Sequence, residues 1–218
     1  MSRALVIAVD GPAAAGKGTL ARRLADALGL PYLDTGLLYR AVGRRMLDAG
    51  LDPAAQPADE QARRVTPEDL KRGDLRVPEV DRAASLVAAQ QAVRAILVDV
   101  QRDFARAAGG VLDGRDIGTV IFPDAQVKLF ITASPAARAR RRWEQLARDP
   151  DAPDREAQIA RVEAELVARD AADAGRAVAP LKAAADAVVI DTDHLTAEQV
   201  LAEALRLVQV RAGALGTV

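Results

Sequence analysis

Residues 4–19 read ALVIAVDGPAAAGKGT, and this stretch decides the fold. Its first six residues are apolar and rich in β-branched side chains, which predicts a strand buried on both faces, as in a parallel sheet. The following residues, Gly11–Lys17, fit the phosphate-loop pattern G-x-x-x-x-G-K. From residue 17 onward the apolar side chains recur at helical spacing, at Leu20, Leu24 and Leu28. The sequence therefore begins with a strand, a phosphate loop and a helix.

The loop between this strand and helix predicts a nucleotide-binding site. Its backbone N–H groups and the helix N-terminus point at phosphate oxygens, and Lys17 reaches the β- and γ-phosphates. Gly18 stands where Ser or Thr is usual, and the hydroxyl follows at Thr19. A Gly- and Ala-rich turn that binds nothing is the alternative. The residues expected to hold the nucleotide are Gly11, Pro12, Ala13, Ala14, Ala15, Gly16, Lys17, Gly18 and Thr19.

The rest of the chain alternates strands with helices. Further strands are predicted at residues 32–34, 111–113, 127–131 and 188–190. Helices are predicted at about residues 37–48 and 80–89, in a further stretch that ends at about 108, from residue 135, from 155 to about 171, and after the capping box of Thr196 and Gln199. This order predicts one α/β domain over residues 1–218, with five parallel strands and helices on both faces of the sheet.

Residues 51–75 differ in composition from the rest of the chain. They are rich in Ala, Pro, Asp and Arg, and their apolar residues show little periodicity. We expect an inserted, mobile segment outside the core, with one short helix that begins at Thr66 and Pro67 and ends at Gly73. The predicted helix that ends near Ala108 has a clear apolar face, made of Val93, Ile96, Leu97, Val100 and Phe104.

Polar residues end the predicted strands, and ligands of parallel sheets bind at these carboxyl ends. After one strand, Thr35 and Arg40 begin a helix and are expected to contact an acceptor nucleotide. After another, Asp113 lies where the magnesium-organising acid of phosphate-loop enzymes lies, and Arg115 can bind a phosphate through two parallel hydrogen bonds. The alternatives are a helix cap with a solvated arginine, and a tight Asp-Gly turn.

Two groups of arginines predict a lid that closes over phosphates. Arg138, Arg141 and Arg142 share one face of a predicted helix. Arg169 and Arg176, with Asp173 between them, share a face if that segment is helical. Surface salt bridges are the alternative for each residue alone.

Composition excludes several kinds of chemistry. The chain has no cysteine and one histidine, His194, so a thiol nucleophile and a multi-histidine metal site are excluded. Lys and Arg number 30 and Asp and Glu 31, a balance that points to neither nucleic acid nor an anionic membrane as partner. No apolar run is long enough to span a bilayer. We expect a soluble, cytoplasmic protein, with His194 structural or facing solvent.

Five motifs, in this order, resemble the bacterial cytidylate kinase family. They are GKGT at residues 16–19, LDTG with YR at 33–40, DGRDIGTV at 113–120, RDAADAGR at 169–176 and APL at 179–181. The resemblance covers nearly the whole chain. It implies a phosphate-loop kinase with a core at residues 1–35, 109–143 and 178–218, a small helical nucleotide-binding insert at about 36–108 and a lid at about 144–177. It also implies a monomer that transfers the γ-phosphate of ATP to CMP or dCMP with Mg²⁺.

The same resemblance implies roles for individual residues. Gly11 to Thr19 would hold ATP, and Thr19 and Asp113 the magnesium ion. The acceptor phosphate would meet Arg40 and Arg115, and the catalytic cations would be Lys17, Arg115, Arg138 and Arg142. The residues implied at the sugar and cytosine of the acceptor are Thr35, Asp116, Arg169 and Asp173 for the sugar, and Ser85, Arg94 and Arg176 for the base.

The chain departs from this family in two informative places. Ala172 stands where family members often carry Arg, and residues 51–80 lack the alternating strands of longer members. Preference for CMP over UMP therefore stays open. A UMP/CMP kinase or another kinase of small acceptors, such as a shikimate-type kinase, is one alternative. A nucleotide-binding switch without a small acceptor is another.

Overall fold

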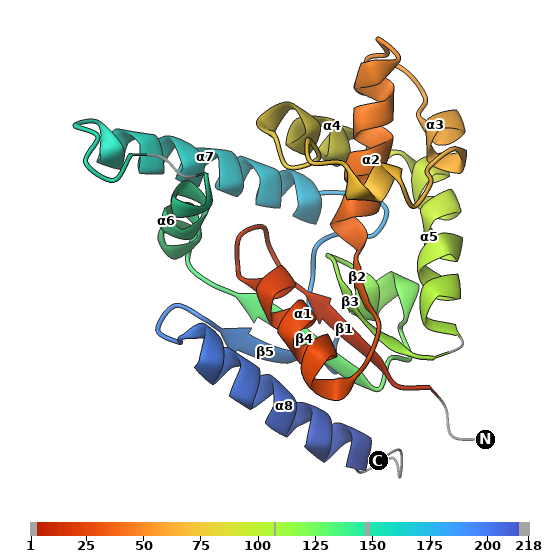
Figure 1. Ribbon diagram of the computed structural model, residues 1–218, viewed down its shortest axis with the longest axis vertical. Helices are drawn as coiled ribbons and strands as arrows, with labels where there is room; N and C mark the ends of the chain where they lie inside the picture. The colour runs from red at the N-terminus through yellow and green to blue at the C-terminus, as the bar shows by residue number, and fades with distance from the viewer. Residues whose placement is uncertain (1–3, 107, 147–148, 214–218) are drawn as a thin grey trace.

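The computed structural model describes residues 4–106, 108–146 and 149–213. Its centre is a five-stranded parallel sheet in the order β2-β3-β1-β4-β5 (Figure 1). The strands are β1 (Val6–Asp10), β2 (Tyr32–Asp34), β3 (Gly110–Asp113), β4 (Val127–Thr132) and β5 (Val188–Asp191). All four pairings are parallel, which confirms the predicted fold class. Residues 1–3, 107, 147–148 and 214–218, which the predicted ranges of the core, insert and lid include, lie outside the described residues.

Helices connect every pair of consecutive strands except β3 and β4, which a single π-helical turn joins. The longer helices are α1 (Lys17–Leu28), α2 (Thr35–Asp48), α4 (Pro78–Ala89), α5 (Gln91–Arg106), α6 (Pro135–Gln145), α7 (Arg155–Ala174) and α8 (Ala197–Gly213). The short turns are α3 (Asp59–Arg63), η1 (Asp69–Lys71) and the π-helical η2 (Ile117–Ile121). The predicted capping box of α8 forms, with reciprocal hydrogen bonds between Thr196 and Gln199, and Ser134 caps α6 by accepting a hydrogen bond from the Ala137 amide.

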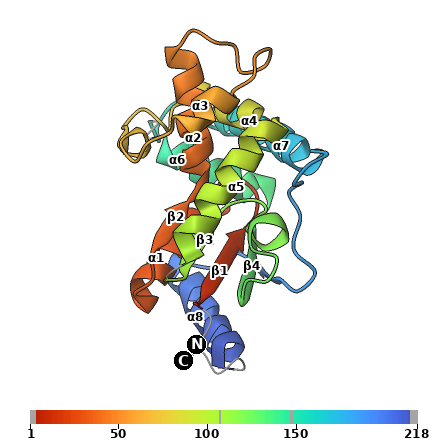
Figure 2. The same ribbon diagram turned by 90° about the vertical axis from the view of Figure 1, so that its right-hand side faces the viewer.

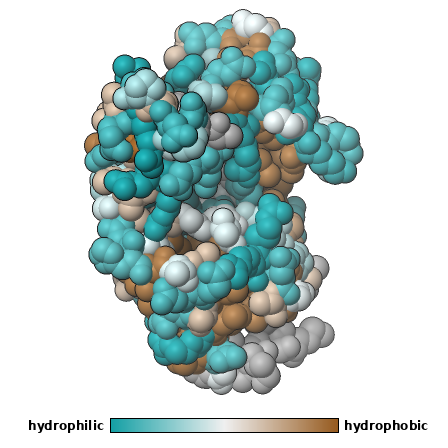
Figure 3. Space-filling view, turned by 60° about the vertical axis from the view of Figure 1, so that its left-hand side comes forward, coloured by the Kyte–Doolittle hydropathy of each residue, from teal (hydrophilic) through white to brown (hydrophobic). Residues whose placement is uncertain are grey.

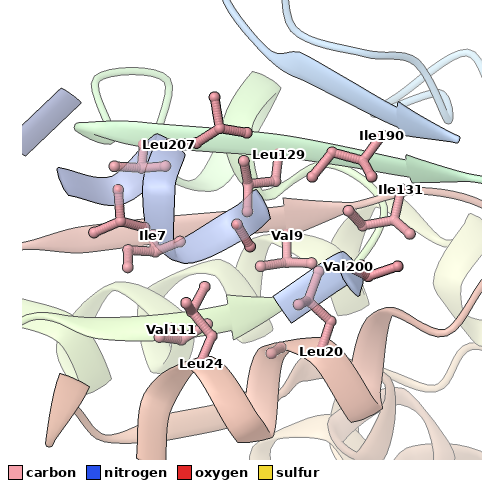
Figure 4. Packing of buried hydrophobic residues seen from close by; sticks show 14 of the residues in the cluster. Ile7, Val9, Leu20, Leu24, Val111, Leu129, Ile131, Ile190, Val200 and Leu207 are labelled. Carbon is pink, nitrogen blue, oxygen red and sulfur yellow. The ribbon is translucent and has the colours of Figure 1, made fainter. Parts of the chain in front are cut away.

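One face of the sheet is covered by α1 and α8. Figure 4 shows Leu20 and Leu24 of α1 packed against Val9 and Val111 of the sheet. The labelled side chains in this cluster are almost fully buried because β1 and β3 lie in the middle of the sheet. This burial explains why β1 is a continuous apolar run instead of an alternating one.

The other face is covered by α5 and η2, and a second core lies above the sheet edge. Figure 2 shows α5 running beside β3 toward the upper helices α2, α3 and α4. Val42 and Met46 of α2 meet Val87 of α4 and Val93 of α5 in this second core. The upper helices therefore form a small packed unit attached to the sheet through α2 and α5.

The expectation that residues 51–75 lie outside the core was wrong. Ala58, Ala62 and Leu75 are almost fully buried, and the first two belong to the second core. Small alanines carry little hydrophobic signal in a sequence, so only their packing against α5 reveals them. The helix expected from Thr66 forms as the single turn η1, and Asp69 bonds back to the Thr66 amide and hydroxyl.

The predicted apolar face of α5 is narrower than expected. Val93 and Leu97 are buried, but Val100 is 46 % exposed. Among the described residues, no single helix has the length and apolar composition needed to cross a membrane. The pair α4 and α5 meets both criteria only if the two helices are counted as one segment, and a bend of 96° separates them.

Polar residues gather at the carboxyl edge of the sheet, as predicted. Asp113 pairs in register with both Asp34 and Val9, so the ends of β1, β2 and β3 lie side by side. Asp10 ends β1 and is buried beneath η2, where it accepts hydrogen bonds from the amides of Ile117 and Gly118, each at 2.8 Å.

Burial of Asp10 predicts a pH dependence of stability. Desolvation raises the pKa of Asp10 to about 6, against the opposing effect of its two backbone hydrogen bonds. Since the folded state binds the proton more tightly, Asp10 stabilises the fold most below about pH 4, and this contribution is lost as the pH rises through about 6. We expect the free energy of unfolding of the wild type, relative to Asp10→Asn, to increase by about 2 kcal/mol between pH 7.5 and pH 4.

Urea unfolding of both proteins at four pH values measures this difference. The matched control is Asp103→Asn, which removes an exposed carboxylate on α5 and should keep the wild-type pH dependence. Parallel curves for the wild type and Asp10→Asn would contradict the argument.

Candidate functional site

A cleft of about 440 Å³ lies at the carboxyl edge of the sheet, between the phosphate loop and the helices above it. Figure 3 shows a recess between the upper and lower parts of the molecule, bordered mostly by hydrophilic side chains. Residues from eight elements (α1, β2, α2, α4, α5, β3, α6 and α7) and from the loops between them line the cleft. The predicted site residues among them are Ala13, Ala14, Gly16, Lys17, Gly18, Thr19, Thr35, Arg40, Ser85, Arg94, Asp113, Arg115, Asp116, Arg142, Arg169, Asp173 and Arg176.

The phosphate loop takes the shape that its glycines allow. Gly16 has φ 89° and precedes α1, and Ala14 also has a positive φ of 59°. Gly11 and Pro12 are buried behind the loop and do not line the cleft. Ala15 faces a second cavity of about 480 Å³ on the other side of the loop, where Thr192, Leu195 and the start of α8 lie.

Gly11 is the position in this loop that tolerates no side chain. Its φ is 144°, and a Cβ there would stand 2.0 Å from the carbonyl oxygen of Ile131 on β4. We expect Gly11→Ala to destabilise the protein by about 3 kcal/mol or more, because the clash is with backbone that cannot move aside. Thermal unfolding checks this, with Gly73→Ala as the control, since a Cβ at Gly73 meets nothing within 4 Å. Equal melting temperatures for the two variants would contradict it.

Lys17 lies at the floor of the cleft beside Asp113. Its Nζ donates to the carbonyl oxygen of Pro12 at 3.0 Å and is 4.0 Å from Oδ1 of Asp113. Burial and the neighbouring Arg115 lower the pKa of Lys17 to about 8, against the attraction of Asp113. Burial raises the pKa of Asp113, and the Lys17 cation opposes that shift. Tyr32 donates to the other oxygen of Asp113 at 3.3 Å.

A buried ion pair closes the back of the cleft. Arg94 of α5 donates to Asp116, and both side chains are less than a tenth exposed. The Arg94 guanidinium also lies over the ring of Tyr39, 5.6 Å from its centre. Burial raises the pKa of Asp116, and Arg94 counteracts this. Paired charges with fixed donors in a dry pocket can recognise the hydrogen-bonding edge of a base.

Asp173 organises the arginines on the lid side of the cleft. It is 2 % exposed and accepts hydrogen bonds from Arg115 at 3.0 Å and from Arg176. Arg176 lies just beyond the end of α7 and still reaches the cleft. Arg169 of α7 is largely buried, and its Nε has no hydrogen-bond partner. Desolvation and the Arg115 charge lower the pKa of Arg169 to about 10.

The arginines of α6 do not act as one group. Arg142 lines the cleft, but Arg138 is buried and donates to Asp170 and to the Ala13 carbonyl, so it does not line the cleft. Arg141 points to the second cavity and donates to Thr192. In this arrangement Arg138 supports the phosphate loop from behind. Arg138, Arg141 and Arg142 therefore lie on one face of α6 but bind different partners.

The donor atoms near Lys17 suit a magnesium ion that a nucleotide carries. Asp113 offers a carboxylate and Thr19 an exposed hydroxyl that lines both cavities. Within the part of the chain that the structure describes, no group of three or more acidic, His or Cys side chains could hold a metal by itself. Mg²⁺ commonly takes one or two protein oxygens and completes its shell with phosphates and water.

Sequence reasoning missed several cleft residues. Asp34, Tyr32, Arg76 and Asp81 all line the cleft. Asp81 precedes the predicted Ser85 by four residues, so helical spacing could have placed both on one face of α4. No sequence signal marks Arg76, which reaches Asp34 from the loop before α4.

A family model described as Cytidylate kinase matches residues 7–210, nearly the whole chain. The chain belongs to the cytidylate kinase family. A cytidylate kinase of Granulibacter bethesdensis is 61 % identical over 207 residues, which cover 94 % of this chain and 97 % of that one. One of Acidiphilium cryptum is 60 % identical over 210 residues, with coverage of 95 % and 97 %.

Among solved structures, a gluconokinase from Sinorhizobium meliloti has a similar fold. Its TM-score is 0.51 at 13 % identity, and the match covers 98 % of this chain and 97 % of that one. At this identity the likeness concerns the fold alone. The expected reaction is therefore inferred from membership of the cytidylate kinase family, and the residues that could carry it out are those that line the cleft.

Proposed function

We propose that this chain transfers the γ-phosphoryl group of ATP to the phosphate of CMP or dCMP in the cleft above β1 and β3. The observation that carries this is the convergence of the phosphate loop, the Arg94–Asp116 pair and the arginines around Asp173 on one cavity. Lys17 and the loop amides would face the donor phosphates. Arg40 and Arg115 would hold the acceptor phosphate, and Arg142 would add positive charge near the transferred group.

The acceptor supplies its own nucleophile. A phosphate oxygen of CMP is anionic near neutral pH, so the new O–P bond forms without a general base while the bond between the β-phosphate oxygen and the γ-phosphorus breaks. ADP leaves with that electron pair. The chain's only histidine, His194, does not line the cleft, which agrees with such chemistry. Mg²⁺, when bound, would neutralise charge on the donor phosphates.

The remaining site assignments extend this proposal. Ser85, Arg94 and Arg176 would contact cytosine, and Thr35, Asp116, Arg169 and Asp173 the sugar. Thr19 and Asp113 would hold the metal, and Arg138 would position the loop. The second cavity beside Thr192 would take the nucleoside of ATP, because it adjoins the phosphate loop on the side away from the acceptor. Residues 36–108 and 144–177 would serve as acceptor-binding part and lid.

Steady-state formation of ADP from Mg-ATP tests the proposal. CMP, dCMP, UMP, AMP and shikimate are compared in parallel, with a control lacking acceptor. We expect CMP and dCMP to be strongly preferred. Equal rates with UMP would support a UMP/CMP kinase, and shikimate-dependent rates a kinase of another small acceptor. ATP hydrolysis that no acceptor stimulates would contradict kinase activity and favour a nucleotide switch.

A further inference from the structure

Asp81 is a carboxylate held between two arginines that come from different helices and line the cleft. Its Oδ1 accepts from Arg40 of α2, at 3.1 Å from Nε and 2.5 Å from a terminal nitrogen. Its Oδ2 accepts from Arg142 of α6 at 2.7 Å. The Asp81 side chain is 14 % exposed, so this contact lies inside the cleft and not on the outer surface.

Each oxygen of this carboxylate takes one guanidinium, as two oxygens of a bound phosphate would. Arginine forks suit carboxylates and phosphates alike, so the two anions compete for the same donors. Arg40 is an arginine that the proposed function gives to the acceptor phosphate. Burial lowers the pKa of Arg40 and Asp81 raises it, which shows that the carboxylate balances a desolvated cation.

The same contact joins two parts of the molecule. α2 and α4 pack together in the second core, whereas α6 packs against α7. Asp81, on α4, therefore ties Arg142 of the lid side to the helices above the sheet. A phosphate that binds Arg40 must break at least one of the two ion pairs that Asp81 makes with Arg40 and Arg142.

We propose that Asp81 is an internal substitute for the acceptor phosphate and sets the affinity for that acceptor by competing for Arg40 and Arg142. This inference rests on the proposed function. Inorganic phosphate must displace Asp81 and has no base or sugar whose contacts could offset that cost. A nucleoside monophosphate meets the same competition from Asp81, and its contacts with the Arg94–Asp116 pair offset that cost. Only molecules in which Asp81 does not occupy Arg40 and Arg142 can bind the phosphate. The apparent Kd is therefore the intrinsic Kd divided by the fraction of such molecules.

Calorimetric titration of wild type and Asp81→Asn with CMP, cytidine and inorganic phosphate tests this inference. Asn keeps the shape of the side chain and removes its charge. We expect the Kd for CMP and for phosphate to fall by about tenfold, and the Kd for cytidine, which has no phosphate, to stay within about twofold. The matched control is Glu79→Gln, which removes one negative charge from the same helix, where Glu79 pairs with Arg44 outside the cleft.

The opposite results would overturn the inference. An unchanged or higher Kd for CMP and phosphate in Asp81→Asn would mean that Asp81 orients Arg40 or has no effect on it. Equal gains in Glu79→Gln would mean a general charge effect. Asp81→Ala and thermal unfolding with and without phosphate separate misfolding from altered binding, since added phosphate should restore stability that the unpaired arginines lose. A wild type that makes no ADP with CMP would contradict the proposed function alone, because the phosphate titration still tests Asp81.

Discussion

Replacement of Lys17 by Met is expected to lower kcat for phosphoryl transfer at least about 10³-fold, with little effect on CMP binding. The Lys17 ammonium is held at the start of α1 by the Pro12 carbonyl and lies 4.0 Å from Asp113, where the donor's terminal phosphates would lie. Met keeps the length and removes the charge. Because Lys17 is almost fully buried, an apolar side chain of similar length should fit without loss of stability.

The pKa of Lys17 adds a second measurement. Its pKa is lowered to about 8 in the protein without nucleotide, so kcat/KM for ATP should fall with the fraction of cationic Lys17 as the pH rises through 8. Lys17→Arg should keep whatever activity remains nearly constant from pH 7 to 9, because its guanidinium stays charged. Lys182→Met, at an exposed lysine away from the cleft, is the control for loss of a lysine. Activity within tenfold of wild type in Lys17→Met would contradict the assigned role.

The sheet was predictable because its signals are local. β1 is buried on both faces, so its residues before Asp10 had to be apolar, and the glycine pattern of the phosphate loop follows directly. The segment 51–75 was not predictable in this way. Ala58 and Ala62 are buried only because α5 lies against them, and nothing within the segment itself indicates that neighbour. The turn η2 was missed for the same reason, since Asp10, far away in the sequence, binds its first amides.

The same distinction between local signals and tertiary contacts applies to the residues of the site. Residues at strand ends, such as Asp113 and Thr35, were found because a parallel sheet brings its carboxyl ends together. Ser85 and Arg94 looked like ordinary helix and came only from resemblance to the family. Asp81 came from neither, because its importance lies in a contact with Arg40 and Arg142 that bridges three helices. Tertiary contacts of charged residues leave little trace in local patterns.

Arginine geometry shows the limit of helical spacing as evidence. Arg138 and Arg142 lie one turn apart on α6, and a shared face predicted a shared role. Arg138 is instead held by Asp170 and the Ala13 carbonyl behind the loop, whereas Arg142 enters the cleft. The long side chains follow their nearest anion, so the position of acidic partners decides which arginines are available to phosphates.

Replacement of Asp113 by Asn is expected to lower kcat about 10²- to 10³-fold and to raise the Mg²⁺ concentration needed for half-maximal activity. Asp113 holds its carboxylate between Lys17 and the Tyr32 hydroxyl at the end of β3, and it lines the same cleft as Thr19. Asn keeps an oxygen there and removes the charge that attracts a divalent cation. Steady-state rates over a Mg²⁺ titration measure both effects.

The melting temperature of Asp113→Asn distinguishes a lower kcat from a loss of folded protein. Burial raises the pKa of Asp113 and the Lys17 cation opposes that shift, so Asp113→Asn removes a buried charge but also leaves Lys17 without this partner. Thermal unfolding therefore checks that the variant is folded at the assay temperature. Tyr32→Phe provides a graded comparison, because it removes the hydrogen bond to Asp113 and keeps the carboxylate. We expect a decrease in kcat of less than about tenfold for that variant. Wild-type activity and an unchanged Mg²⁺ requirement in Asp113→Asn would show that the carboxylate acts only on Lys17, as a local partner of its charge.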